Sequence, residues 1–535
     1  MDALDHIGDE YFHTTFAADP FAATVFGVPG HEADVPDPSR AAAERRQAEL
    51  ARMAGDLREV GTARLGTQER ISHAILTRLL ADGRRMLRDA TSEVAVTASI
   101  AGPFAQAVSV VATAPEPDAA YLARLEKVGG YFDAHAELYL QAAQDGRFPT
   151  ALGVRQAAAQ IDAYLSTAIE RDVFGRCDPR ATEIVHEVVR PALRRFRTTL
   201  QDRLLPLGRG DEHVGLCHVP GGREAYRTLV GAYTTTKLEP EEIHAIGLGL
   251  VADLQVEFTE RGGRVFGSGA GVIARLRDDP ELRFGTSAEI VDTVTDALRR
   301  AEEAVPDLFH VYDIAPCTVK EMDPAEAENS VLGYYMPPAA DGSRPGTHVV
   351  NTFRPQLRPR YEYEALAFHE SVPGHHLQIG VAQSRTDVPR FRRFTYFDAH
   401  GEGWGLYTER LSDDLGLYTS ELNRLGMASF DAWRACRLVV DTGLHHLGWS
   451  RRRAIDYMLE NTALSHTNIT NEVDRYIAMP GQALAYMIGR LRIQQLRDRA
   501  RATLGPRFDI RDFHHEVLAH GPLPLDTLDE LIPGR

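Results

Sequence analysis

Hydrophobic residues recur three and four positions apart along most of the chain, with charged residues between them. This spacing, typical of helices that bury one face, is clear over residues 41–60, 68–90, 181–207 and 238–258. The last of these also has a proline and acidic residues in its first turn, as helices commonly do. Strand patterns are scarce in the first 210 residues. The pattern therefore predicts long helices over most of the sequence.

One region, residues 316–352, has the pattern of β-strands. Three short runs rich in β-branched and aromatic residues occupy 317–322, 330–336 and 347–353. The prolines and glycines of 337–346 predict a hairpin-type connection between the second and third runs. Helical spacing then returns and continues nearly to the end. We therefore expect a mainly α protein with a small β-sheet.

The helical pattern breaks at 205–222, which is rich in glycine and proline. Such a stretch is typical of a linker, or of a loop that reaches into a site. We expect a helical N-terminal region, 1–210, and a second region, 211–535, that contains the sheet and the most unusual segment of the chain. The two regions are expected to form one continuous structural unit.

Composition and charge exclude several classes of protein. The chain has 535 residues, 44% hydrophobic and 25% charged, an ordinary globular composition. Its formal net charge of −17 argues against a nucleic-acid groove, which needs a basic face. No apolar run is long enough for a transmembrane helix, the acidic N-terminus lacks a secretory pattern, and the cysteines stand far apart. We expect a cytoplasmic protein with no nucleic-acid or membrane partner.

The segment 369–376 reads His-Glu-Ser-Val-Pro-Gly-His-His. In a zinc-binding helix, His-Glu-x-x-His places two imidazoles one turn apart, and the glutamate acts as general base for a zinc-bound water. Pro373 stands here where the second histidine would be. Three histidines and a glutamate so close together are nevertheless rare in an ordinary surface or core helix. The segment predicts a Zn2+ site at His369, with Glu370 as general base.

The second ligand follows from helix geometry. At about 100° per residue, His375 lies roughly 240° round an unbroken helix from His369, and His376 lies about 10.5 Å along the axis. However, Pro373 and Gly374 permit a bulge or break that would bring one of them back beside His369. We favour His375, which needs the smaller insertion, and keep His376 as the alternative.

A third ligand is expected in the segment FDAHGEGWGLYTERL. Glu402 lies 33 residues after His369, between Gly401 and Gly403, which leave room for a neighbouring helix or a metal. Two histidines and a glutamate are a common set around catalytic zinc. Glu409 shares a helix face with Glu402 and is a candidate to orient an imidazole. Taken alone, the two glutamates are also consistent with the exposed face of an amphipathic helix.

The motif HExxPGHH followed by EGWGLY resembles a large bacterial family, domain-of-unknown-function family 885, whose members are regarded as candidate metallopeptidases. Further segments resemble it: GYYMPP, VVNT, VDTGLHHLGW, RYIAMPGQALAYMIG and DFHHEVLAHGPLPLDTLDELI. The resemblance is most specific from Val331 to the C-terminus. The chain is also distantly similar to helical gluzincins, such as oligopeptidases and carboxypeptidases. This likeness implies a gluzincin-like fold with a deep central cleft.

Two residues are candidates to assist catalysis. A developing oxyanion needs a hydrogen-bond donor, and Tyr476, beside a Pro-Gly turn, is our first choice. His445 is the second, because Asp441 lies one helical turn before it and could pair with it. The alternative for the tyrosine is a core aromatic residue, and for the Asp–His pair a surface contact.

Other residues are candidates to bind substrate. Tyr335 and Asn351 would face a peptide added to the edge of the sheet. Tyr486 flanks the same Pro-Gly turn as Tyr476, and either Arg475 or Arg354 could bind a substrate carboxylate. The histidine pair 514–515 is interpreted as structural.

Three functions remain open. The first is a zinc peptidase acting on short peptides, because a closed helical channel would exclude folded proteins. The second is a zinc amide hydrolase of a small metabolite. The third is a helical binding protein with a degenerate metal site, suggested by Pro373 in the ligand position.

Overall fold

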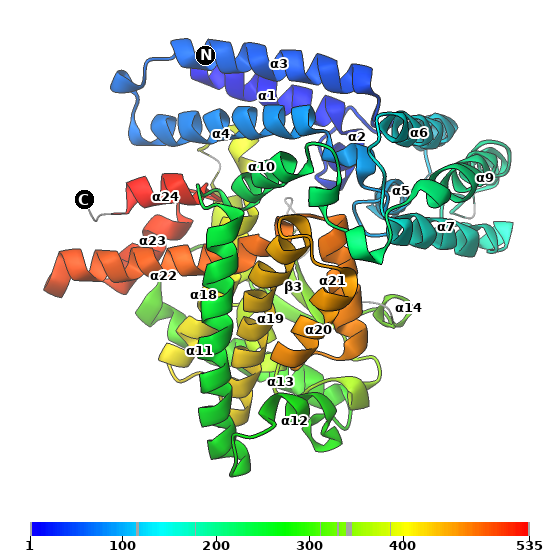
Figure 1. The fold of residues 1–535 in the computed structure, drawn as a ribbon. Coiled ribbons are helices and arrows are strands. Elements are labelled where there is room, and N and C mark those ends of the chain that lie inside the picture. Colours follow the sequence, from blue (N-terminus) through cyan, green and yellow to red (C-terminus); the bar gives the residue numbers. More distant parts are fainter. Residues whose placement is uncertain are drawn as a thin grey trace.

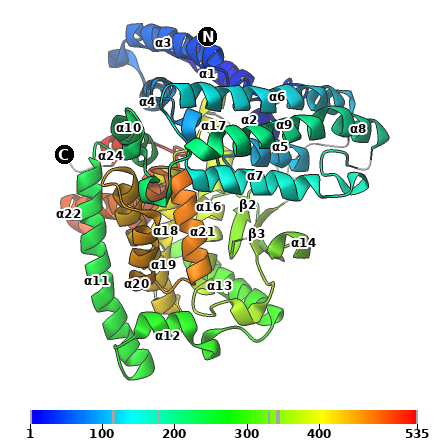
Figure 2. The same ribbon diagram turned by 45° about the vertical axis from the view of Figure 1, so that its right-hand side comes forward.

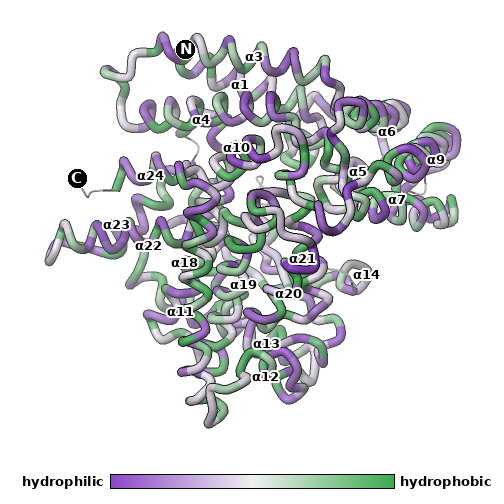
Figure 3. The backbone as a smooth tube through the Cα atoms, in the orientation of Figure 1, coloured by the Kyte–Doolittle hydropathy of each residue, from purple (hydrophilic) through white to green (hydrophobic). Residues whose placement is uncertain are grey.

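Helices form most of the molecule, as the spacing predicts. The computed structural model describes residues 3–113, 117–176, 178–310, 312–328, 331–338, 345–385 and 387–532. The tube in Figure 3 alternates between hydrophilic and hydrophobic positions along most helices, which is the pattern of helices that bury one face. No described helix is both long enough and apolar enough to cross a membrane.

The N-terminal helices form the upper part of Figure 1. Short π-helical turns continue α8 into α9 and extend α9 to Leu204. The bounds are α1 (Ala3–Ala18), α2 (Pro20–Val25), α3 (Arg40–Glu59), α4 (Thr67–Asp89), α5 (Pro103–Thr113), α6 (Ala119–Gln144), α7 (Ala151–Leu165), α8 (Pro179–Ile184) and α9 (Arg190–Thr198).

Most of the remaining helices form the lower part, in which the long helices α11 and α19 pack against each other, whereas α10 lies higher, against α4. Their bounds are α10 (Gly222–Thr234), α11 (Pro240–Phe266), α12 (Val272–Asp278), α13 (Ser287–Leu308), α14 (Pro324–Ala327), α15 (Tyr363–Glu370), α16 (His375–Ser384), α17 (Arg390–Arg393), α18 (Asp398–Asp414), α19 (Glu421–His445), α20 (Arg451–Asn461), α21 (His466–Ala478), α22 (Ala485–Leu504), α23 (Ile510–Leu518) and α24 (Leu525–Leu531).

The small sheet lies where the strand patterns predict it. Its strands are β1 (Cys317–Glu321), β2 (Gly333–Met336) and β3 (Gly346–Val350), in the order β1-β3-β2. β1 runs parallel to β3 and β2 antiparallel to it, with Tyr335 opposite His348. The antiparallel pairing of β2 and β3 agrees with the predicted hairpin-type connection, although residues 339–344 of that connection lie outside the described part. α13, α15 and α16 contact this sheet (Figure 2).

The hydrophobic core does not divide at residue 210. The largest cluster of buried apolar side chains joins α1, α3 and α4 to helices of the second region, and runs from Leu4 to Ile532. A second cluster lies mainly within the segment from α5 to α9 and also includes Phe21 of α2 and Val96. The glycine-rich segment 205–222 forms short turns that pack beside the end of α19, where the Leu216 amide donates to the buried His445 ring.

Candidate metal centre

The helix that carries the unusual motif is broken in two. α15 ends at Glu370 and α16 begins at His375, so the loop 371–374 separates the two histidines. The Val372–Pro373 peptide bond is cis. A break, rather than a bulge inside one continuous helix, therefore absorbs the extra residues.

Neighbouring residues hold this loop in place. The Trp404 indole N–H donates to the Pro373 carbonyl over 2.9 Å, and Ser371 hydrogen-bonds with His348 of β3 over 3.0 Å. At Gly374 a Cβ atom would lie only 1.9 Å from the His369 carbonyl oxygen. Any larger residue would push the loop away from the end of α15, so the close return of the chain requires glycine here.

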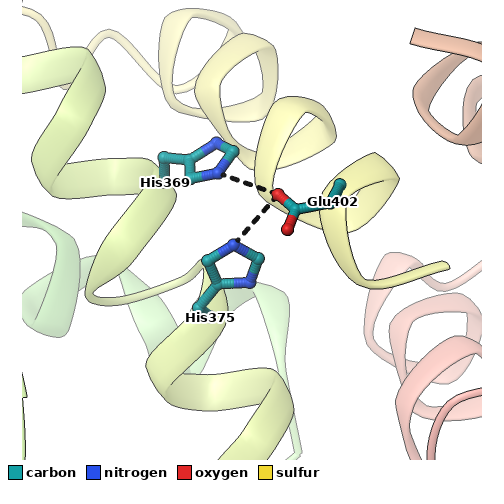
Figure 4. Close-up of side chains that lie close together, drawn as sticks. All are labelled: His369, His375 and Glu402. Atoms are coloured by element: carbon teal, nitrogen blue, oxygen red, sulfur yellow. Dashed lines mark ion pairs between the residues drawn. The ribbon is translucent and has the colours of Figure 1, made fainter. Parts of the chain in front are cut away.

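The break brings three donor side chains together (Figure 4). His369 Nε2 lies 3.6 Å and His375 Nε2 3.5 Å from the same carboxylate oxygen, Oε2 of Glu402. One ligand atom from each residue can be chosen so that all lie within 4.8 Å of one another. His376, the alternative, lies outside this group, and its Nδ1 is 3.0 Å from the Tyr335 hydroxyl. The set is therefore His369, His375 and Glu402.

A second carboxylate orients the first imidazole. Glu409 Oε1 lies 2.8 Å from His369 Nδ1, so Nδ1 donates to this carboxylate while Nε2 faces Glu402. Glu409 is fully buried, and a Cβ at Gly405 would lie 2.6 Å from the His369 ring. The glycine thus makes room for the imidazole on α18, the same helix that supplies both glutamates.

The pKa values reflect this crowding. Burial lowers the pKa of His369, but hydrogen bonds with Glu402 and Glu409 outweigh it and raise the pKa to about 9. Burial raises the pKa of Glu402, but the two histidines hold it well below its usual range. Burial also raises the pKa of Glu370. A cation that binds between the two imidazoles must therefore displace a firmly held proton from His369.

One residue at this centre was not among the sequence-based candidates. The Tyr396 hydroxyl lies 3.4 Å from Glu402 Oε1, and a Cβ at Gly401 would lie 2.0 Å from that hydroxyl. Tyr396 is 45% exposed, so this side of the centre reaches solvent. An aromatic residue six positions before a glycine-flanked glutamate is the signal that could have drawn attention to it.

Tyr476 and His445 do not have the predicted surroundings. The buried Tyr476 hydroxyl donates to Glu472 over 2.6 Å and accepts from Trp433 and Arg437, so it has no proton to offer a substrate. His445 accepts from the Leu216 amide and hydrogen-bonds through Nε2 with the Tyr476 carbonyl. Both residues are fully buried, and their hydrogen bonds stabilise the fold.

The predicted Asp441–His445 pair does not form. The Asp441 carboxylate accepts instead from the Tyr226 hydroxyl over 2.5 Å and from the Gly481 amide over 3.0 Å. Both donors come from segments far from residue 441 along the chain. The one-turn spacing within α19 therefore did not decide the partner.

The predicted substrate residues of the sheet separate into two groups. Asn351 is fully buried, and its amide donates to the carbonyls of Ala327 and Val331, so it braces a loop and does not face a substrate. Tyr335 lies close to the centre, because its hydroxyl contacts His376 and its backbone hydrogen-bonds with Glu370.

The remaining candidates lie in different surroundings. Arg475 donates to Glu472 and Gln482, whereas Arg354 pairs on the surface with Glu328 over 3.3 Å. Tyr486 lies near Glu402, whose charge acts on its pKa, although burial is the larger cause that raises this pKa to about 12. His514 is buried, and His515 contacts Tyr312, as expected for structural residues.

Comparison with known proteins identifies the family. A putative lipoprotein from Colwellia psychrerythraea has a crystal structure with a TM-score of 0.90 and 25% identity, covering 99% of this chain and 98% of that one. The structure of a putative lipoprotein of unknown function from Shewanella oneidensis, at 15% identity, has a TM-score of 0.79 and covers 99% and 100%. Curated proteins gave no match. Because residues 20–532 match the family described as bacterial protein of unknown function (DUF885), the chain belongs to that family.

Proposed function

We propose that this protein is a zinc-dependent hydrolase that cleaves amide bonds of short peptides. The observation that carries the proposal is the convergence of His369, His375 and Glu402 within 4.8 Å, beside the half-buried Glu370. The gluzincin-like fold with a deep cleft, expected from the sequence, belongs to the same proposal.

The donor set fits zinc better than magnesium or calcium. Two imidazole nitrogens and one carboxylate oxygen are typical of catalytic zinc, whereas magnesium and calcium prefer oxygen ligands alone. His369 and His375 would bind through Nε2, and Glu402 through Oε2. When bound, zinc lowers the pKa of a water molecule and polarises a carbonyl group.

The protein's own residues supply the proton chemistry in this proposal. Glu370 follows His369 directly, and burial raises the pKa of its carboxyl, which makes its carboxylate a stronger proton acceptor. Tyr396 takes the role first expected of Tyr476. Its hydroxyl donates to Glu402 Oε1 over 3.4 Å, a much longer hydrogen bond than the 2.6 Å bond of Tyr476 to Glu472, and in this proposal it turns to a developing oxyanion instead.

The surroundings support a small substrate. His369 and His375 are 3% and 8% exposed, so a folded protein could not bring its backbone to them. β2 is an edge strand, and its Tyr335 backbone hydrogen-bonds with Glu370. An extended peptide beside this strand would lie next to the base.

Metal analysis and peptide cleavage test the proposal together. We expect one zinc ion per purified chain and cleavage of a random peptide library, both lost after chelation and restored by zinc. Glu370→Gln should retain zinc but lower kcat by about a thousandfold or more, because it removes the general base.

Other outcomes would point to the other functions. Turnover of acylated amino acids alone would identify a small-metabolite amide hydrolase. Absence of stoichiometric zinc, with no change in Glu370→Gln, would leave a non-catalytic binding protein and refute the proposal.

A further inference from the structure

Three charged residues from two helices, α19 and α21, form a cluster outside the metal centre. Arg475 donates to Glu472 through Nε and one terminal nitrogen, and Arg437 donates to the same carboxylate over 3.0 Å. Two guanidinium groups thus share a single glutamate. We call Arg437, Glu472 and Arg475 the arginine cluster. Its two guanidinium groups and one carboxylate leave one positive charge without a balancing negative charge.

One donor of this cluster has no partner. Arg437 is 3% exposed, yet its NH1 nitrogen is buried and makes no hydrogen bond within the described part of the chain. Its guanidinium carbon lies 4.3 Å from the Trp433 ring centre and 4.5 Å from that of Tyr486. A buried cationic N–H without an acceptor is costly, so an acceptor that arrives from outside would be bound firmly.

A short chain of hydrogen bonds leads from the cluster to α18, the helix that carries Glu402. Asp398 lies one helical turn before Glu402 on α18, about 6 Å along the axis. Its carboxylate accepts from Gln482 over 3.1 Å, and Gln482 accepts from Arg475 over 2.9 Å. The side chains of Arg475 and Glu472 are 25% and 20% exposed, so the cluster is open on one side.

We infer that the arginine cluster binds the terminal carboxylate of a peptide substrate, so that the protein removes short fragments from C-termini. Guanidinium groups match carboxylates through paired hydrogen bonds, and the aromatic rings beside Arg437 hold its plane in place. An extended peptide advances about 3.5 Å per residue, so only a few residues fit between the cluster and the metal centre. This inference rests on the proposed function and names its substrate class.

Two peptide libraries test it without any variant. Both consist of N-acetylated pentapeptides of randomised sequence, one with free carboxylates and the other with C-terminal amides. We expect kcat/KM for the free acids to be about 10- to 100-fold higher, because a charge-assisted hydrogen bond is lost with the amide. Cleavage should fall within the last three residues. Equal cleavage of both libraries would overturn the inference while leaving the proposed function intact.

Variants locate the effect. Arg437→Gln should reduce the acid-to-amide preference to a few-fold while zinc content is unchanged. Arg392→Gln is the matched control, because Arg392 is equally buried but donates to Gln68 and Ser72 in another part of the molecule. A folded Arg437→Gln that keeps the full preference would also overturn the inference.

A binding measurement decides the case in which neither library is cleaved. That result would refute the proposed function, but the cluster could still bind carboxylates. N-acetyl-trialanine and its amide would then be titrated into the protein by calorimetry. We expect the acid to bind about tenfold or more tightly, and equal affinities would refute carboxylate recognition.

Discussion

The imidazole of His369 is fixed from both of its nitrogens. Glu409 lies 2.8 Å from Nδ1, and Glu402 lies 3.6 Å from Nε2. The first contact selects the tautomer whose Nε2 lone pair is available to a metal, so a residue that touches no substrate can still determine metal affinity.

Glu409→Gln tests this role. The variant keeps an oxygen acceptor for Nδ1 but loses the negative charge, so we expect zinc affinity to fall about 10- to 100-fold. Competition with a chromophoric chelator would measure it. Glu370→Gln is the control and should bind zinc nearly as tightly as the unaltered protein. Equal affinities for all three proteins would contradict the role of Glu409.

Tyr396→Phe tests the phenol. We expect kcat to fall about 100-fold with little change in KM or zinc content, because the hydroxyl would act on the transition state alone. Tyr407→Phe removes a hydroxyl that hydrogen-bonds with His514, and should lower stability without lowering kcat. A full kcat in Tyr396→Phe would show that another group stabilises the oxyanion.

The sequence predicted the grouping of side chains correctly where residues close along the chain determine the local geometry. The grouping of His369, His375 and Glu402 follows from the Pro-Gly break and the flanking glycines, both visible in the sequence. By contrast, the two donors to the Tyr476 hydroxyl and the acceptors of the Asn351 amide come from segments that only the fold brings near. The spacing within one helix cannot reveal such contacts, which is why the surroundings of both residues differ from those predicted.

At the scale of elements, α18 is organised by glycines that alternate with larger residues. A Cβ at Gly403 would lie 2.5 Å from the Gly489 backbone of α22, so this position sets how closely the two helices pack. A Cβ at Gly401 would meet the Tyr396 hydroxyl, and one at Gly405 would meet the His369 ring. Three glycines on one helix therefore have three separate tasks.

Alanine substitution should separate these tasks. Gly403→Ala should lower the free energy of unfolding by about 1 to 3 kcal/mol through overpacking. Gly405→Ala should weaken zinc binding about tenfold or more by displacing the imidazole. Gly401→Ala should chiefly lower kcat, because the exposed Tyr396 can rotate away without strain. Thermal melts, chelator competition and peptide cleavage distinguish the three, and identical profiles would contradict this assignment.

Most elements were predictable from periodicity, and their exact ends were not. β1 and β2 fall within the predicted runs, and β3 begins one residue before its run, at Gly346. The segment 205–222 was predicted to be a linker or site loop, but its turns pack against α19. Glycine and proline indicate where a helix stops, whereas the surface against which the following turn packs is decided by tertiary contacts.

At the scale of the whole molecule, the first and last helices share one core. α24 packs against α4, and the buried Arg392 of α17 donates to Ser72 of α4. This arrangement is consistent with the expectation that the two regions form one structural unit, because the core crosses the boundary at residue 210. The N-terminal helices α1, α3 and α4 therefore support the same body that holds the centre.

Global stability should depend on pH through Glu362. Burial raises the pKa of this carboxyl from 4.5 to about 7, partly offset by a hydrogen bond from Ser429. Because the folded protein binds this proton more tightly than the unfolded chain does, the free energy of unfolding is highest below pH 4.5 and falls as the pH rises to 7. Glu362→Gln should therefore gain about 2 to 3 kcal/mol relative to the unaltered protein between pH 5 and pH 8. Urea unfolding with a chelator present measures this, and parallel pH curves would contradict it.

The break between α15 and α16 also changes how such a centre is to be sought in other genomes. A search pattern that demands two histidines one helical turn apart passes over this protein, because Pro373 occupies the required position. Here a loop, closed by Gly374 and by the indole of Trp404, substitutes for the missing turn. Genes that encode a Pro-Gly interruption followed downstream by the sequence Gly-Glu-Gly-Trp-Gly would give the same three-dimensional arrangement from a different sequence motif.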